Sequence, residues 1–418
     1  MTLHSYDMAA TIELFPAGNG DAILLDLETS LILIDCGYVS TYRDHIKPRL
    51  LELSAAGRTL TKMIITHIDA DHIQGAIAFI EENGDASTPS VIGIDEIWFN
   101  SYRHLHFTDK QTGSLAGRPL DFQIPSGLAS IEADDSERLV SFSQGTGLGS
   151  LILKNRYAWN TTFDHGAVYS DDTLRIALDA DTTITVLGPT KKVLERLGNS
   201  WYTYLKKIFA GAINEDTFFD DAFEMMLEEM RQEQLEQDAQ LDEETLVSSW
   251  GNWVDTYTTE WTREDSSPTN ASSIIFLLEH KGKTFLSLAD AIPSQVVEQL
   301  KKKYDDQDLP IHVDVLKVAH HGAWKNNSPE LIQMIQADYF LFSSNGLRHR
   351  HPHLQTIAWI LKSHQSHSPK KLVFNYMQQD RLIDVESSDG KAMYNYETLW
   401  PDVDEFGNGK DGYIKLTF

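Results

Sequence analysis

Residues 66–72 read Thr-His-Ile-Asp-Ala-Asp-His and place four potential metal ligands, two imidazoles and two carboxylates, within six residues. They follow Lys62-Met63-Ile64-Ile65, an apolar and partly β-branched run that predicts a buried strand. The spacers Ile68 and Ala70 alternate with the polar groups, so the ligands can converge while the spacers pack. A helix is predicted to begin at His72. The ligands would then lie on a strand-to-helix turn, where α/β sheets usually carry their chemistry.

This donor set mixes nitrogen with hard oxygen and offers no thiolate. Such a mixture suits zinc, manganese or iron. The alternative is a polar loop that holds its histidines by chance, and we disfavour it.

The motif His67-x-Asp69-x-Asp71-His72 resembles the metal-binding signature of the metallo-β-lactamase fold, in the variant seen in the hydrolase domain of ComEC-type competence proteins. Seven further blocks are similar to blocks of that family. Most are weak alone, and their shared order along the chain makes the resemblance specific. The blocks are 18–25 (GNGDAILL), 33–37 (LIDCG), 184–189 (ITVLGP), 270–277 (NASSIIFL), 285–291 (FLSLADA), 316–322 (LKVAHHG) and 351–353 (HPH).

The resemblance implies an α/β fold, the αββα sandwich of this family. We expect the core over residues 1–375, with insertions at about 100–170 and 195–265 and a C-terminal extension over 376–418.

The resemblance also implies two divalent transition metal ions, zinc or manganese. His67 and Asp69 would bind one ion, and Asp71 and His72 the other. Asp290 follows a predicted strand and would be the bridging carboxylate, with a helix N-cap as its alternative role. The expected ligands are His67, Asp69, Asp71, His72, Asp290 and His320.

Two positions depart from many relatives. Asp69 stands where they carry a second histidine, and Asn270 occupies the region of a later ligand. An all-imidazole shell for the first ion is therefore absent, which makes manganese credible beside zinc. His165 could supply a displaced ligand, although a loop histidine is the favoured interpretation.

Three neighbours of the ligands receive supporting roles. His321 would orient a ligand or touch substrate, because adjacent residues at a strand end point to opposite sides. Asp21 and Asp35 are assigned mainly to hydrogen bonds beneath the site, and Asp35 is a candidate to orient a ligand histidine.

A site of this kind hydrolyses its substrate with a hydroxide that bridges two cations, and Asp71 is a catalytic candidate as well as a ligand. Residues 348–353 (RHRHPH), with Lys362, Lys370 and Lys371, form a basic island in an acidic sequence. This island and Lys317 could hold phosphate oxygens, and His351 could protonate a leaving oxygen. His353 is as consistent with a Pro-fixed turn as with function.

We therefore favour a metal-dependent phosphodiesterase or nuclease that takes a phosphodiester or nucleic-acid substrate at this local basic site. One alternative is hydrolysis of a carbonyl compound such as a lactone, thioester or lactam. Another is an effector that acts only within a protein complex, for instance in a bacterial defence or competence system. Fold alone does not choose among them.

Composition limits the partners and the compartment. The formal net charge of −27 argues against a generic nucleic-acid-binding surface. No run approaches the roughly 20 apolar residues that span a bilayer, so no membrane partner is expected. A single cysteine, Cys36, suits a reducing compartment, and we expect a cytoplasmic protein.

The second insertion is strongly acidic. Residues 214–245 contain thirteen acidic residues and one arginine. Phe219, Phe223, Met226 and Met230 recur at helical spacing, which favours an amphipathic helix packed on the sandwich. The alternative is a lid, or an arm over about 205–258 that docks a protein partner.

Overall fold

The computed structural model describes residues 10–105, 147–172, 174–199, 253–258, 260–364, 366–402 and 414–417. The sequence also predicts a helix around 126–143, within the first insertion. This stretch and the acidic stretch 214–245 lie outside the described residues, so the predictions about them remain predictions. Among the described helices, none combines the length and the apolar character that crossing a bilayer requires.

The first sheet has the strand order β14-β1-β2-β3-β4-β5. Strands β1 to β3 pair antiparallel, β14 pairs antiparallel with β1, and β3, β4 and β5 are parallel. The strands are β1 (Thr11–Leu14), β2 (Ile23–Leu27), β3 (Ser30–Ile34), β4 (Lys62–Ile64), β5 (Ile97–Trp98) and β14 (Ile414–Thr417).

The second sheet has the order β13-β12-β11-β10-β9-β8-β7-β6. Strands β9 to β13 are parallel, whereas β6 to β9 pair antiparallel. The strands are β6 (Leu174–Ala177), β7 (Thr182–Gly188), β8 (Ile275–His280), β9 (Lys283–Ser287), β10 (Ile311–Lys317), β11 (Ile335–Phe342), β12 (Lys370–Phe374) and β13 (Tyr396–Leu399).

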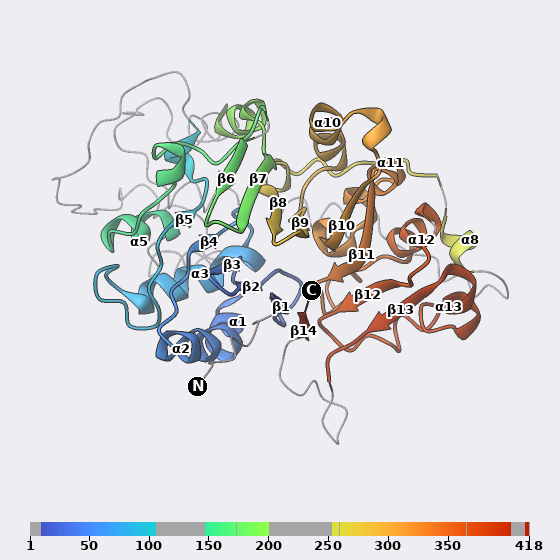
Figure 1. Cartoon of the computed structure of the whole chain (residues 1–418), viewed down its shortest axis with the longest axis horizontal. Helices are drawn as coiled ribbons and strands as arrows, with labels where there is room; N and C mark the ends of the chain where they lie inside the picture. The colour runs from blue at the N-terminus through green and yellow to red at the C-terminus, as the bar shows by residue number, and fades with distance from the viewer. Residues whose placement is uncertain are drawn as a thin grey trace, which may run out of the picture.

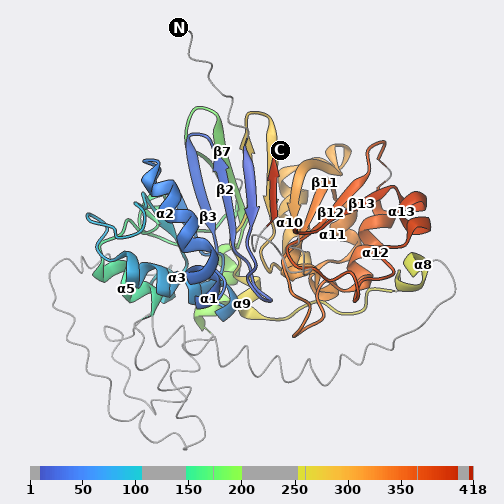
Figure 2. The ribbon, with the colours of Figure 1, turned by 90° about the horizontal axis from the view of Figure 1, so that it is seen from below.

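Helices cover the outer face of each sheet (Figure 2). On the first sheet these are α1 (Val39–Thr41), α2 (Lys47–Ala55), α3 (Ala70–Asn83) and α5 (Leu148–Lys154). On the second sheet they are α8 (Trp253–Tyr257), α10 (Pro293–Lys303), α11 (Pro329–Gln333), α12 (Leu354–Ser363) and α13 (Ser388–Tyr394). The short helix α9 (Pro268–Ala271) precedes β8, which lies between β7 and β9 in the second sheet (Figure 1).

Strand β3 shows why the layers form. All five residues are buried, but they face two different cores. Leu31 and Leu33 pack under the helices of the first layer. Ile32 and Ile34 pack between the sheets, in one cluster with Phe276 and other residues of the second sheet. Because both faces are covered, residues 31–34 are continuously apolar, and each buried aliphatic side chain contributes about 1.5–3 kcal/mol. The layer order is αββα, as the sequence predicts.

Two predicted peripheral regions are partly built into the layers. Helix α5 packs on α3, and Trp159 bridges to Ile97 of β5, so residues 147–168 belong with the first layer. At the other end of the chain, β13 extends the second sheet and β14 pairs with β1 of the first.

The turns that follow the strands converge at one end of the sandwich. Several of their residues have left-handed backbone conformations: Asp35 (φ 52), Ala289 (φ 46), His320 (φ 44), His321 (φ 56) and Arg350 (φ 56). Non-glycine residues with such angles are uncommon and cluster at functional sites. Backbone hydrogen bonds join the turns, from His320 N to Ala289 O (2.8 Å) and from His353 N to Gly322 O (3.1 Å).

Candidate metal centre

Asp290 follows β9 and lies at the centre of a buried group of imidazoles. Its Oδ2 is 3.5 Å from Nε2 of both His72 and His321, 3.6 Å from Nε2 of His320 and 3.8 Å from Nε2 of His67. Donors around one tetrahedral ion, with bonds of about 2.0–2.2 Å, lie about 3.3–3.6 Å apart. The separations are therefore those expected of donor atoms that surround shared cations.

The motif at 66–72 spans the loop after β4 and the first turn of α3. His67 Nε2 lies 3.6 Å from Asp69 Oδ2. Asp69 is extended (φ −66, ψ 144) and occupies the N-cap position, but its side chain makes no capping hydrogen bond. Helix α3 begins at Ala70, so the predicted start at His72 was two residues late. His72 N and Ile73 N both donate to the backbone oxygen of Asp69 (2.9 and 3.1 Å), so the first helical turn closes on Asp69, ahead of the apolar pattern.

Asp35 orients the histidines of this motif. Its Oδ2 lies 2.8 Å from Nδ1 of His72, which leaves Nε2 directed at Asp290. Thr66 donates to Asp35 through its backbone N (2.8 Å) and its Oγ1 (2.7 Å), and this Oγ1 lies 3.0 Å from Nδ1 of His67. The expected role of Asp35 behind a ligand histidine agrees with these contacts.

Asn19 supports Asp71, and the sequence analysis did not identify it. Its Nδ2 donates to Asp71 Oδ2 (2.6 Å), and its Oδ1 accepts from Tyr38 Oη (2.9 Å). A Cβ on Gly20 would lie 1.8 Å from the Asp71 carbonyl oxygen, so only glycine allows this turn to approach α3. The Gly-Asn-Gly sequence indicated the turn but not its long-range contact.

His320 and His321 both face Asp290, which corrects the argument that adjacent residues point to opposite sides. Alternation holds for an extended strand, whereas both histidines are left-handed (φ 44 and φ 56). Gly322 follows at φ 89, and a Cβ there would lie 2.5 Å from Cβ of Pro352. The His-His-Gly sequence thus forms a tight turn that presents both rings to one carboxylate.

Lys317 does not reach substrate in this arrangement. Its side chain is fully buried, its Nζ lies 2.7 Å from Asp21 Oδ2, and it donates to Val318 O (3.0 Å). Asp21 Oδ1 is in turn 3.4 Å from Nδ1 of His321. The predicted phosphate contact is therefore replaced by a buried ion pair, because the last residue of β10 directs its side chain into the sandwich.

Asp21 lies among the residues of the cluster, although a purely structural role beneath the site was expected for it. One ligand atom each from Asp21, His72, Asp290 and His321 lies within 4.8 Å of the others, and all four residues are buried. The position of Asp21 in the sequence did not indicate that it is close enough to share a cation with these residues.

His351 lies beside the cluster, with its ring 5.3 Å from the ring of His320. Arg381 holds the turn by donating to the carbonyl oxygens of Arg350 (2.7 Å) and His351 (2.9 Å). His353 is the N-cap residue of α12, and its Nδ1 accepts from Trp324 N (3.2 Å). These contacts favour the structural role for His353.

The predicted basic island is smaller in the structure. Lys362 pairs with Asp255, and Lys371 donates to Tyr339 Oη (2.8 Å). Lys370 is buried and donates to the carbonyl oxygens that end α12, 2.8 Å from Ile360 O. The exposed arginines of the island are Arg348 and Arg350, on the turn that carries His351.

The carboxylates and imidazoles of the cluster shift one another's pKa values because they lie close together. Burial alone would raise the pKa of Asp290, but His321, His320 and His72 hold it well below its usual range. Conversely, burial would lower the pKa of His320, while Asp290 and Asp265 raise it to about 9. His351 differs, because burial and its histidine neighbours hold its pKa well below the usual value.

Several nitrogen and oxygen atoms of the cluster have no hydrogen-bond partner, which indicates the kind of ligand that they could bind. Nε2 of His67, of His72 and of His321 and Oδ1 of Asp290 are buried without a hydrogen-bond partner. Buried polar atoms are normally hydrogen-bonded. Nitrogen and carboxylate donors that converge without partners fit divalent transition metal ions.

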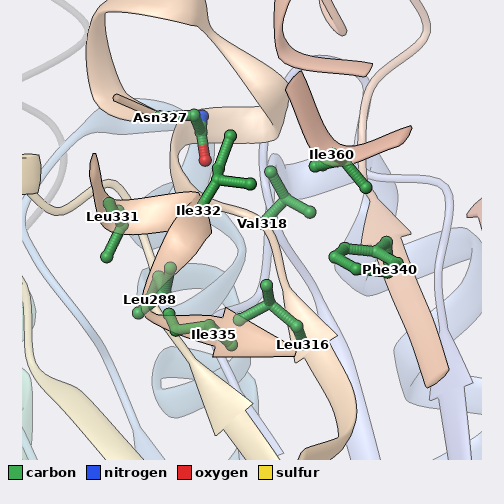
Figure 3. Close-up of a pocket in the computed structure, with 9 residues that line it drawn as sticks. All are labelled: Leu288, Leu316, Val318, Asn327, Leu331, Ile332, Ile335, Phe340 and Ile360. Carbon is green, nitrogen blue, oxygen red and sulfur yellow. The ribbon is translucent and has the colours of Figure 1, made fainter. Parts of the chain in front are cut away.

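A small hollow elsewhere in the described part of the chain is not a candidate site. It lies between α11, α12 and strands β10 and β11, and nearly all of its lining is apolar (Figure 3). Its volume of about 10 Å³ has room for no more than one water molecule. Asn327 in its wall is already bonded to Ala319 O (2.8 Å) and Ala323 O (2.7 Å).

Comparison with known families agrees with this geometry. Residues 15–154 match the model of the metallo-beta-lactamase superfamily. The matched range runs from the end of β1 to α5 and contains the ligand motif. No curated protein matches the chain. The superfamily match and the buried Asp/His cluster together indicate a metal-dependent hydrolase. The more specific ComEC-type resemblance stays a prediction.

Proposed function

We propose that this protein is a two-metal phosphodiesterase, with nucleic acid as the favoured substrate. The observation that carries the proposal is Asp290 Oδ2, which four imidazole Nε2 atoms surround at 3.5–3.8 Å. The residues proposed to hold the ions are His67, Asp69, Asp71, His72, Asp290, His320 and His321.

Two divalent cations bound there would supply a nucleophile at neutral pH and neutralise charge on a phosphoryl oxygen. The protein's contribution is to hold its donor groups in place before substrate arrives. Asn19 fixes the carboxylate of Asp71, and Asp35 fixes the ring of His72, so neither group needs to reorganise during the reaction.

His351 is proposed to contact the leaving oxygen. Its lowered pKa makes the ring neutral at neutral pH, so it would offer an N–H hydrogen bond to that oxygen. Through this hydrogen bond the neutral ring would stabilise the negative charge that develops on the leaving oxygen, and the proton that this oxygen finally takes would come from solvent. Nδ1 of His351 is buried without a hydrogen-bond partner, which agrees with a ring that is not committed to a structural contact.

The preference for a phosphodiester over a carbonyl substrate rests on Arg348 and Arg350. Both side chains are exposed on the turn that leads to His351. In a chain with a net charge of −27, a pair of arginines beside the site supports an anionic substrate. Guanidinium groups match phosphate geometry through paired N–H donors.

A substrate panel tests the proposal. The metal-free protein is reloaded with zinc or manganese and assayed on single-stranded DNA, bis-p-nitrophenyl phosphate and a thioester. The proposal expects metal-dependent cleavage of the two phosphodiesters. Hydrolysis of the thioester alone would assign the site to carbonyl chemistry. No hydrolysis by the fully loaded protein would leave the complex-dependent effector as the better account.

A further inference from the structure

His320 is held from behind by a buried asparagine. Its Nδ1 lies 3.0 Å from Asn326 Oδ1, and its Nε2 lies 3.6 Å from Asp290 Oδ2. The ring is thus fixed between an amide on one side and the carboxylate at the centre of the cluster on the other.

The orientation of the Asn326 amide follows from its surroundings. Its Nδ2 is 2.8 Å from Asp265 Oδ2, 3.1 Å from Asp290 O and 3.3 Å from Ala291 O. All three are acceptors, so the amino group must face them and the amide oxygen must face His320. This oxygen can only accept, and Asp265 Oδ2, 3.7 Å from the same Nδ1, is a second acceptor, so both favour a proton on Nδ1 of His320. The amino group of Asn270 also lies 3.3 Å from this Nδ1, but its shorter hydrogen bond, at 2.6 Å, goes to Asp265 Oδ2. Nε2 is then the nitrogen left to bind a cation, which would displace any proton held there beside Asp290.

Asp265 fixes the orientation of the Asn326 amide through the hydrogen bonds that its carboxylate accepts. It lies between α8 and α9 and is buried. Its Oδ2 accepts from Asn326 Nδ2 (2.8 Å) and from Asn270 Nδ2 (2.6 Å), and its Oδ1 accepts from Ser267 N (2.9 Å). Only a carboxylate, which accepts at both oxygens, satisfies all three donors.

We propose that Asp265 is a positioning residue that acts through Asn326 to hold His320 in the tautomer that binds a divalent cation through Nε2. The inference rests on the metal centre of the proposed function. The competing account is that Asp265 merely anchors the loop before α9, where Ser267 already caps the helix.

Substitution of either residue should weaken cation binding. In Asp265→Asn the amide oxygen can accept either from the two amino groups or from Ser267 N, but not from all three, and the negative charge behind His320 is lost. In Asn326→Ala the acceptor for His320 Nδ1 is lost. Removal of such supporting residues typically weakens metal affinity about 10–100-fold. Because both residues act on the same nitrogen and Asp265 is bonded to Asn326, the double variant should lose less affinity than the sum of the two single losses.

The measurement is a chelator-competition titration of zinc into each metal-free protein. It is paired with proton NMR of the cobalt-substituted protein, which reports exchangeable imidazole N–H protons near the ion. The resonance that His320→Ala removes should be lost or shifted in both variants. A role limited to anchoring the loop would not move it.

Asp314→Asn is the matched control. Asp314 on β10 also accepts from a backbone N–H and a hydroxyl, both of Thr284 (2.9 Å each), and takes no part in the cluster. It should lower stability without changing zinc affinity.

The outcomes separate this inference from the proposed function. A wild-type protein that binds no cation would overturn both. Wild-type binding with an unchanged dissociation constant and N–H resonance in Asp265→Asn and Asn326→Ala would overturn this inference alone. An equal loss of affinity in Asp314→Asn would also overturn it, because general destabilisation would then explain the effect. If one variant does not fold, the other decides by the same criteria.

Discussion

Oδ2 of Asp290 lies 3.5 Å from Nε2 of His321, although His321 adjoins another histidine that faces the same oxygen. The left-handed turn at residues 320–321 makes this pairing geometrically accessible. Asp290 is therefore the group on which the loops after β4, β9 and β10 converge.

Replacement of this carboxylate should remove hydrolysis but not the fold. We expect Asp290→Ala and Asp71→Ala each to lower metal-dependent cleavage of bis-p-nitrophenyl phosphate by at least about 1,000-fold, since each removes a proposed ligand and not core packing. Circular dichroism and thermal unfolding check that the fold is retained. Asp314→Asn serves as the control with normal activity. Activity retained in either alanine variant would show that the site is misplaced.

Lys317 and Asp21 should behave as a buried ion pair. Removal of one partner leaves an uncompensated buried charge, so Lys317→Met and Asp21→Asn should each lower the free energy of unfolding by about 3–5 kcal/mol. The double variant should lose less than the sum of the two. Urea denaturation of the metal-free proteins measures this coupling. A Lys317→Met protein of wild-type stability but raised KM for phosphodiesters would instead restore the phosphate-binding role.

Glu96 should contribute stability that acid removes. Burial would raise its pKa, but hydrogen bonds from Lys62, Thr162 and Thr161 lower it to about 2. Because the folded-state pKa lies below the ordinary glutamate value of 4.5, the contribution is present above that value and is lost as the pH falls toward 2.

We expect Glu96→Gln to be less stable than wild type at pH 7, by on the order of 2–3 kcal/mol. The difference should shrink at pH 3. Urea denaturation of the metal-free proteins at both pH values checks this. An equal or larger difference at pH 3 would contradict the assignment.

Arg348 and Arg350 should matter more for a polymer than for a small substrate. Their joint replacement by alanine should raise KM for single-stranded DNA by about tenfold at low salt, and leave KM for bis-p-nitrophenyl phosphate within about twofold. The effect on DNA should diminish as salt screens the arginines. Initial rates at 50 and 200 mM salt test this. Equal effects on both substrates, independent of salt, would rule out an extended contact with the strand.

Local patterns in the sequence were sufficient to predict the layers and the strand ends that carry the ligands. The apolar run at residues 62–65 predicted β4, and Asp290 was correctly expected to follow a strand, which is β9. The exact turn conformations were not accessible. Nothing in the His320-His321 pair indicates two left-handed residues in succession. Strand alternation therefore predicted that the two rings point to opposite sides, whereas both face Asp290.

Supporting residues were the harder part of the site, because their contacts cross long stretches of chain. Asp265 and Asn326 are 61 residues apart, and Asn19 is 52 residues from Asp71. Lys317 was placed on the correct strand, but its burial depends on Asp21 from a distant turn. Such pairings depend on how the two sheets pack, which a pattern within one segment does not specify.

Metal stoichiometry tests the central claim most directly. Elemental analysis of the purified wild-type protein, before and after reconstitution with zinc or manganese, should give two ions per chain. The seven proposed ligands are too many donors for one tetrahedral ion, and loading at 100-fold above the dissociation constant should stabilise the fold by about 2.7 kcal/mol per site. No more than trace metal after reconstitution, with no change in thermal stability, would contradict the account.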